Sequence, residues 1–197
     1  MRSGKLEKQR TEESFIISYD QLTKHKTIDL YREFLECREK KCDEIVTLQK
    51  EFKEPVVTIR ANYPGKDKNN EITRFITAEI KQAFKEMFHS KISQEEIYDM
   101  PEGLTQFYSV RGDARTLKEN AVYIEQNHPL GRFVNIDVYD HNEDYAVTRM
   151  ELFYEPRQCF LCDKAAKVCS REENHKVEDL IQYMEERISD YKEDKLK

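Results

Sequence analysis

The chain has 197 residues, of which 38% are hydrophobic and 37% charged, and its net charge of −6 at pH 7 argues against a general nucleic-acid binder. No apolar run approaches the roughly 18 residues of a membrane span, and the N-terminus lacks the apolar stretch of a signal peptide. Five cysteines without an export signal indicate a reducing compartment, so we expect a soluble cytoplasmic protein.

Hydrophobic periodicity and the capping and turn residues divide the first half of the chain into four segments. We expect a polar N-terminal extension at 1–26, a helix from an N-cap at Thr27 to about 52, a strand from 55 to a turn at 64–65, and a helix from an N-cap at Asn70 to 88.

The second half continues with alternating elements. We expect a strand near 106–110, a helix at 113–126, a strand at 132–138, a turn at 141–144, a strand within 145–153 and a closing helix at about 177–188. The chain is long enough for one core and short for two. We therefore predict an α+β fold in which 27–197 form a single domain, a mixed sheet with packed helices.

The first candidate site is the stretch HPLGRFVNIDVYD, residues 128–140. Strict alternation after the Pro-Leu-Gly break predicts a strand with one buried face. Gly131 lets the chain approach a ligand closely, and Arg132 offers planar donors that suit phosphate. On the polar face Asn135 lies beside Asp137, a hard oxygen ligand that suits Mg²⁺ bound to phosphates. The strand resembles those of nucleotidyltransferases, although an ordinary solvated strand face carries similar residues.

The second candidate site is RQCFLCDKAAKVCSREENH, residues 157–175. Cys159, Cys162, Cys169 and His175 supply the ligands of a Cys₃His zinc site. In the alternative interpretation, the three cysteines share one face of a helix, because they recur at steps of three and four, and they pack as small hydrophobes. No Gly or Pro breaks the stretch into turns, so packing is preferred over zinc.

A resemblance to a known family rests on both sites together. HPLGRFVNIDV is followed about twenty residues later by PRQCFLC, and then by Cys169 and His175. Upstream, PVVTIRANYPG, NNEITR, the PEG at 101–103 and Lys118 stand in the expected order. Over about 27–190 the chain resembles the citrate lyase holo-[acyl-carrier-protein] synthases, which are apo-citrate lyase phosphoribosyl-dephospho-CoA transferases.

The resemblance implies a reaction and its partners. The substrate would be 2′-(5″-triphosphoribosyl)-3′-dephospho-CoA, and a serine hydroxyl of the apo acyl carrier subunit of citrate lyase would attack the phosphate nearest the ribose, releasing pyrophosphate. A triphosphate needs its charge neutralised by a divalent cation, expected to be Mg²⁺, and by Arg or Lys. Neither a nucleic acid nor a membrane is expected as a partner.

Individual residues then receive expected roles. We expect Asp137 and Asn135 at the catalytic edge with His128 as acceptor of the serine proton, Mg²⁺ on Asp137 with Glu151 or Asp140, and substrate contacts from Gly131, Arg132, Lys118, Arg149 and Arg74. A histidine before proline can equally cap the preceding helix, so the role of His128 stays open.

One residue departs from the family pattern. The family places an aspartate where this chain has Asn135, which keeps a carbonyl oxygen but brings no negative charge to Mg²⁺. The rival interpretation is a non-catalytic, zinc-stapled protein-interaction module, whose polar strand face would be solvated surface only.

Overall fold

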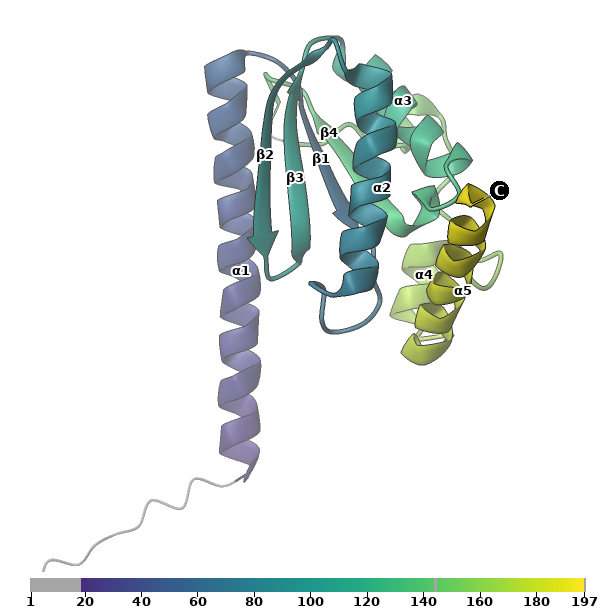
Figure 1. Ribbon diagram of the computed structural model, residues 1–197. Coiled ribbons are helices and arrows are strands. Elements are labelled where there is room, and N and C mark those ends of the chain that lie inside the picture. The colour runs from purple at the N-terminus through teal and green to yellow at the C-terminus, as the bar shows by residue number, and fades with distance from the viewer. Residues whose placement is uncertain (1–18, 144, 197) are drawn as a thin grey trace, which may run out of the picture.

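The computed structural model describes residues 19–143 and 145–196, with side chains from residue 35 onward. Its helices and strands are α1 Tyr19–Phe52, β1 Val56–Ala61, α2 Glu71–Phe88, β2 Ile92–Met100, β3 Gly103–Val110, α3 Ala114–Asn127, β4 Val134–Tyr139, α4 Ala166–Arg171 and α5 Val177–Lys195 (Figure 1). Within these residues, no helix combines the length and the apolar character needed to cross a membrane.

The strands form one four-stranded sheet with the order β2-β3-β1-β4. The crossover through α2 gives β1 and β2 the same direction, but β3 folds back from β2 and lies between them, so all pairings are antiparallel rather than mixed. This β-α-β-β-α-β connectivity is the split βαβ, or ferredoxin-like, arrangement. The α+β class with packed helices is confirmed, while a nucleotidyltransferase-like fold stays a prediction.

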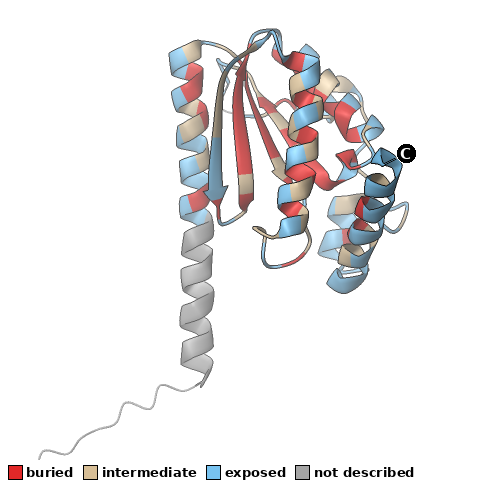
Figure 2. Ribbon diagram, viewed as in Figure 1, coloured by how far each residue is buried: buried red, intermediate tan, exposed pale blue. Residues whose placement is uncertain are grey.

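Helices cover both faces of the sheet (Figures 1 and 2). On one face, buried residues of α2, α3 and α5 pack against alternate residues of β1 and β4, namely Val57, Ile59, Val134, Ile136 and Val138. On the other face, α1 contributes Cys37, Ile45 and Leu48 to a smaller core with Val56 and Phe107. The alternation predicted for β4 is confirmed, and its polar face lies on the side of α1.

The first helix begins earlier than predicted. It starts at Tyr19, so Thr27 is an interior residue and not an N-cap. No Gly or Pro interrupts 19–52, which explains why the helix continues through the expected boundary. Residues 1–18 lie outside the described part of the chain, and the division at 26/27 stays a prediction.

The strand β2 was missed by sequence reasoning. It is an edge strand whose residues are mostly exposed or half-buried, and it carries Glu95, Glu96 and Asp99. Charges are common on edge strands because they discourage pairing with another chain. The alternation that reveals a half-buried strand is therefore weak here, whereas β3 begins three residues before its predicted start of 106.

The prediction of a strand within 145–153 is wrong. Ala146 forms a single bridge to Tyr139, and Met150–Leu152 form a 3₁₀ turn. The cause is a capping box, in which the Thr148 N–H donates to Glu151 Oε1 and the Glu151 N–H donates to Thr148 Oγ1. These reciprocal bonds start a helical turn where apolar residues alone suggested a strand.

Candidate active site

The polar face of β4 carries the two residues predicted for catalysis. Asn135 and Asp137 are half-buried, and the register places them opposite Arg60 and Thr58 of β1. Directly opposed residues point to the same face, so Arg60 joins this surface. From α1, Lys41 Nζ lies 3.9 Å from Asp137 Oδ2. Three elements thus meet around one carboxylate.

Positive charge predominates around Asp137. Burial lowers the pKa of Lys41 and of Lys118, and the nearby Asp137 carboxylate offsets part of this effect on each. The positive charge of Arg60 also lowers the pKa of Lys41, and Arg60 forms an ion pair with Glu102. Burying cations near one another is unfavourable unless an anion is close, so the arrangement suits a multiply charged anionic ligand.

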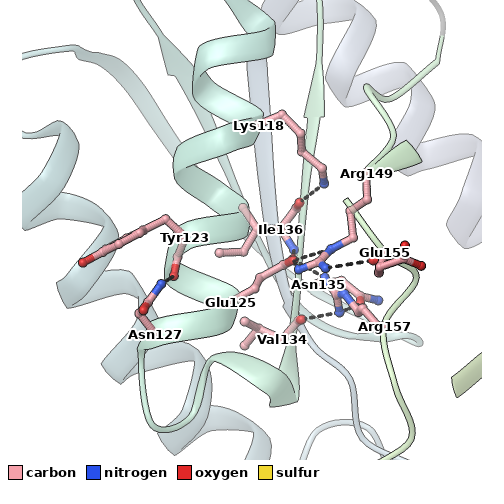
Figure 3. Close-up of polar contacts among 10 residues, drawn as sticks. All are labelled: Lys118, Tyr123, Glu125, Asn127, Val134, Asn135, Ile136, Arg149, Glu155 and Arg157. Atoms are coloured by element: carbon pink, nitrogen blue, oxygen red, sulfur yellow. Dashed lines mark hydrogen bonds and ion pairs between the residues drawn. The ribbon is translucent and has the colours of Figure 1, made fainter. Parts of the chain in front are cut away.

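A buried ion network lies along the outer edge of β4 (Figure 3). Glu125 of α3 is 3% exposed, and its carboxylate accepts from Arg149 Nη2 at 3.0 Å and from Arg157 Nη2. The Ile136 N–H also donates to Glu125 Oε1 at 2.9 Å. Several donors therefore satisfy this buried carboxylate, as burial of a charge requires.

The same network occupies backbone oxygens of β4. Lys118 reaches from α3 and donates from Nζ to the Ile136 oxygen at 2.6 Å. Arg157 Nη1 donates to the Val134 oxygen at 2.7 Å and to Asn135 Oδ1 at 2.5 Å. Arg157 thus connects the buried network to the polar face, since it bonds Glu125 and Asn135 at once.

A cavity of about 330 Å³ opens beside this network. Its lining includes Arg132, Arg149 and Arg157 together with Glu125 and Asn62. A second cavity of about 720 Å³ shares Asn62, Phe160 and Ala166 with the first, and its lining also includes Lys68. Cavities of this size accommodate small-molecule ligands, and the arginines favour an anionic one.

The glycine and the arginine of the 128–140 stretch are placed differently from expectation. They lie in the 3₁₀ turn Gly131–Phe133 before β4, and not on the strand. A Cβ on Gly131 would come 2.3 Å from the Ile124 oxygen, so the glycine permits close approach to α3 and not to a ligand. Arg132 Nη2 donates to the oxygens of Gln158 and Cys159.

His128 lies away from this surface. It follows the last residue of α3, and its Nδ1 accepts from the Leu130 N–H at 3.1 Å. Its ring is 5.5 Å from that of Tyr191 on α5, which covers the opposite face of the sheet. Burial lowers the pKa of His128. His128 is thus the C-cap of α3, as in the capping interpretation that the sequence left open.

Three other predicted residues also have partners elsewhere. Arg74 Nη2 bonds Asp99 at 3.1 Å on β2, the strand at the far edge of the sheet from β4. Glu151 serves the capping box, and Asp140 Oδ1 lies 2.8 Å from His141 Nδ1. The structure thus gathers Asn135, Asp137, Lys118, Arg132 and Arg149 into one region, whereas Arg74 and His128 lie elsewhere.

Sequence reasoning missed Lys41, Arg60, Glu125 and Arg157. Arg157 lies within the PRQC motif, which was noted in the sequence, but no role was predicted for the arginine itself. Glu125 stands among the buried residues Ala121, Val122 and Ile124 of α3, a pattern that flags a buried charge. Lys41 and Arg60 gave no such signal.

The cysteine cluster is not one face of a helix. Cys159 and Cys162 precede α4, Cys169 lies on α4, and His175 follows it. Their sulfur and ring nitrogen atoms all lie within 4.8 Å of one another. The geometry expected from the packing interpretation is therefore wrong, and metal binding stays a prediction.

Comparison with known proteins identifies the family. The CitX family model, described as apo-citrate lyase phosphoribosyl-dephospho-CoA transferase, matches residues 30–191. A protein of that name from Escherichia coli O7:K1 (strain IAI39 / ExPEC) is 32% identical over 139 residues, covering 69% of this chain and 75% of that protein. Another of the same name from Escherichia coli O1:K1 / APEC is 31% identical with the same coverage.

A longer relative matches the same domain. Protein CitXG of Leuconostoc mesenteroides subsp. cremoris is 27% identical over 145 residues, which cover 72% of this chain but 31% of that protein. The family model spans most of the chain. The chain therefore belongs to the apo-citrate lyase phosphoribosyl-dephospho-CoA transferase family and is a transferase enzyme.

Proposed function

We propose that this enzyme transfers phosphoribosyl-dephospho-CoA from triphosphoribosyl-dephospho-CoA to a serine of the apo acyl carrier subunit of citrate lyase, with pyrophosphate as leaving group. The observation that carries the proposal is the half-buried Asp137 beside Lys41, on the strand face where Arg157 of the arginine-lined cavity bonds Asn135. One carboxylate surrounded by cations fits a metal-bound polyphosphate, whose negative charges exceed those of the protein site.

The arginines of the cavity would hold the triphosphate. Arg149 and Arg157 direct part of their donors to Glu125, which fixes both guanidinium groups in place. Arg132 uses Nη2 for its bonds to Gln158 and Cys159, so within the described residues its Nε and Nη1 are available to phosphate oxygens. Planar guanidinium groups suit such oxygens because they donate two bonds at once.

Asp137 is the proposed ligand for Mg²⁺. Its side chain is 36% exposed and meets Lys41 only at 3.9 Å, which is longer than a normal hydrogen bond. Mg²⁺ commonly binds one or two carboxylates together with substrate phosphates and waters, so a single aspartate at this edge fits it. The ion would supply charge neutralisation for the triphosphate and the departing pyrophosphate.

The other contribution of the protein would be to position the reacting groups. Phosphoryl transfer proceeds through a loose transition state that requires alignment and charge stabilisation more than covalent participation. Lys41 and Arg157 lie on either side of the Asp137–Asn135 face and can bind oxygens of the reacting phosphate. We therefore propose no general base, since His128 lies on the opposite face of the sheet, beside Tyr191; its role as proton acceptor stays a prediction.

Mass spectrometry of the carrier tests the proposal. Incubation of the enzyme, apo acyl carrier subunit, precursor and Mg²⁺ should increase the mass of the carrier by one prosthetic group and release pyrophosphate. A carrier whose acceptor serine is replaced by alanine should remain unmodified, and a chelator should stop transfer. A carrier that binds the protein but keeps its original mass would contradict the proposal in favour of a non-catalytic interaction module.

A further inference from the structure

The four ligand-type residues of the cysteine cluster come from three short segments. Cys159 and Cys162 lie in a turn closed by the Cys159 N–H, which donates to the Lys164 oxygen at 2.8 Å, and by the bridge between Gln158 and Ala165. The α4 helix then supplies Cys169, and the connection to α5 supplies His175. A turn carrying two cysteines, followed by two more ligands, is a common construction of structural zinc sites.

The distances within the cluster suit one tetrahedral ion. The sulfurs of Cys162 and Cys169 are 3.9 Å apart, and His175 Nε2 is 3.2 Å from the Cys162 sulfur. Zn–S bonds of about 2.3 Å at tetrahedral angles separate two sulfurs by about 3.8 Å. A disulfide would require about 2.05 Å, and the three cysteines are free thiols.

Few residues of this segment are buried. Between residues 157 and 176, Cys159 and Cys169 are the buried residues, and both are ligand candidates. The segment therefore has no apolar core of its own, and α4 has only six residues. Short segments of this kind are commonly held by a disulfide or a metal, since hydrophobic burial cannot offset their conformational entropy.

We propose that Cys159, Cys162, Cys169 and His175 bind one structural Zn²⁺, and that this ion holds the segment that positions Arg132 and Arg157. Binding replaces the thiol protons, which pass to solvent, with bonds from three thiolate sulfurs and one neutral imidazole nitrogen to the metal. Four protein ligands leave no open position, so the ion has a structural and not a catalytic role.

Two sets of hydrogen bonds connect the cluster to the active site. Arg132 Nη2 donates to the Cys159 oxygen at 2.6 Å and to the Gln158 oxygen at 3.0 Å. Arg157, two residues before the first ligand, donates to Asn135 Oδ1 at 2.5 Å. The zinc site itself is independent of the proposed function, whereas its effect on transfer rests on it.

Metal analysis of the purified full-length chain tests the site. Protein produced with zinc in the medium should contain about one zinc per chain. Cobalt substitution should give the thiolate charge-transfer bands and visible bands of a tetrahedral ion. A chelator that removes the ion should lower the melting temperature and raise the number of thiols accessible to a colorimetric reagent. Metal-free protein whose melting temperature and thiol accessibility do not respond to zinc or chelator would overturn the proposal.

Serine variants of two cysteines distinguish a proposed zinc ligand from a cysteine outside the site. Cys162→Ser should lose zinc, while Cys42→Ser, at an exposed position on α1, should keep it. If Cys162→Ser does not fold, the cobalt spectrum of the unmodified chain decides the matter, because tetrahedral thiolate bands require these ligands. Retention of zinc by folded Cys162→Ser would overturn the assignment.

The effect on transfer is measured separately. Zinc removal should reduce transfer far more than it changes carrier binding, because Arg132 and Arg157 lose their fixed positions. Full transfer by zinc-free protein would overturn the positioning role while leaving the metal site in place. A zinc-loaded enzyme that never transfers the group would instead contradict the proposed function and not the zinc site.

Discussion

Arg157 donates from Nη1 to the side-chain oxygen of Asn135 over 2.5 Å, so this amide already has a cationic partner. Asn135→Asp would convert this bond between a cation and a neutral amide into an ion pair, and we expect a gain in the free energy of unfolding of roughly 0.5–1.5 kcal/mol. The new charge is neutralised by Arg157, so the Mg²⁺ concentration for half-maximal transfer should stay the same. A lower Mg²⁺ requirement would show that residue 135 is a direct metal ligand.

Asp137→Asn should reduce transfer by orders of magnitude, since the amide removes the carboxylate charge that we propose binds Mg²⁺ while keeping the size of the side chain. The fold should persist, because Asp137 is partly exposed. Asp99→Asn is the matched control, at the opposite edge of the sheet, and should retain transfer. Near-normal transfer by folded Asp137→Asn would remove Asp137 from the mechanism.

Glu125→Gln should lower the free energy of unfolding by about 3–5 kcal/mol, because it removes the buried anion that the half-buried Arg149 and Arg157 share. Urea unfolding followed by circular dichroism measures the change. Asp190→Asn breaks the exposed pair with Arg187 and should cost less than about 1 kcal/mol. Equal effects of both variants would show that the network contributes nothing specific to stability.

His128→Asn should keep transfer and reduce the pH dependence of stability. Burial lowers the pKa of folded His128 below its ordinary 6.5, so the unfolded chain binds the proton more readily. Its contribution to stability is complete above pH 6.5 and is lost as the pH falls from there through the folded pKa. Thermal melts between pH 5 and 7.5 should show a shallower decline for the variant. Loss of transfer by a folded variant would restore His128 as proton acceptor.

Glu151→Gln should leave both the rate of transfer and its Mg²⁺ dependence unchanged, because Glu151 caps the turn at Thr148 and an amide oxygen can accept the same bonds. Thr148→Ala should lower the melting temperature, since it removes the hydroxyl that completes the capping box. An increased Mg²⁺ requirement in Glu151→Gln would instead support the predicted role of Glu151 as a metal ligand.

Local signals predicted much of the fold. Asn70 caps α2 as predicted, accepting from the Thr73 N–H. Asp113, the predicted first residue of the next helix, is the N-cap of α3 and accepts from the Thr116 N–H. The alternation in β4 identified its buried face correctly, because period two follows directly from strand geometry. The polar edge strand β2 lacks that pattern, because it is held in the sheet by its pairing with β3 and not by burial of its own apolar side chains.

The active site was predictable only where one segment carries it. Asn135 and Asp137 could be placed on one face from their spacing alone. Arg60 joins them through the register of β1 against β4, and Lys41 joins through the packing of α1 on the sheet. Such neighbours arise from tertiary structure and leave no trace in local sequence. Conversely, Arg74 had suitable chemistry but lies at the wrong edge.

The hydrogen bonds made to β4 by Lys118, Glu125 and Arg157 have a consequence for the behaviour of the protein in solution. A sheet edge with free N–H and C=O groups is a template on which a strand of another molecule can add. Here charged side chains occupy those groups, so the edge is closed without a fifth strand. Loss of Glu125 or Arg157 would therefore expose an adhesive edge, and self-association would accompany the loss of stability.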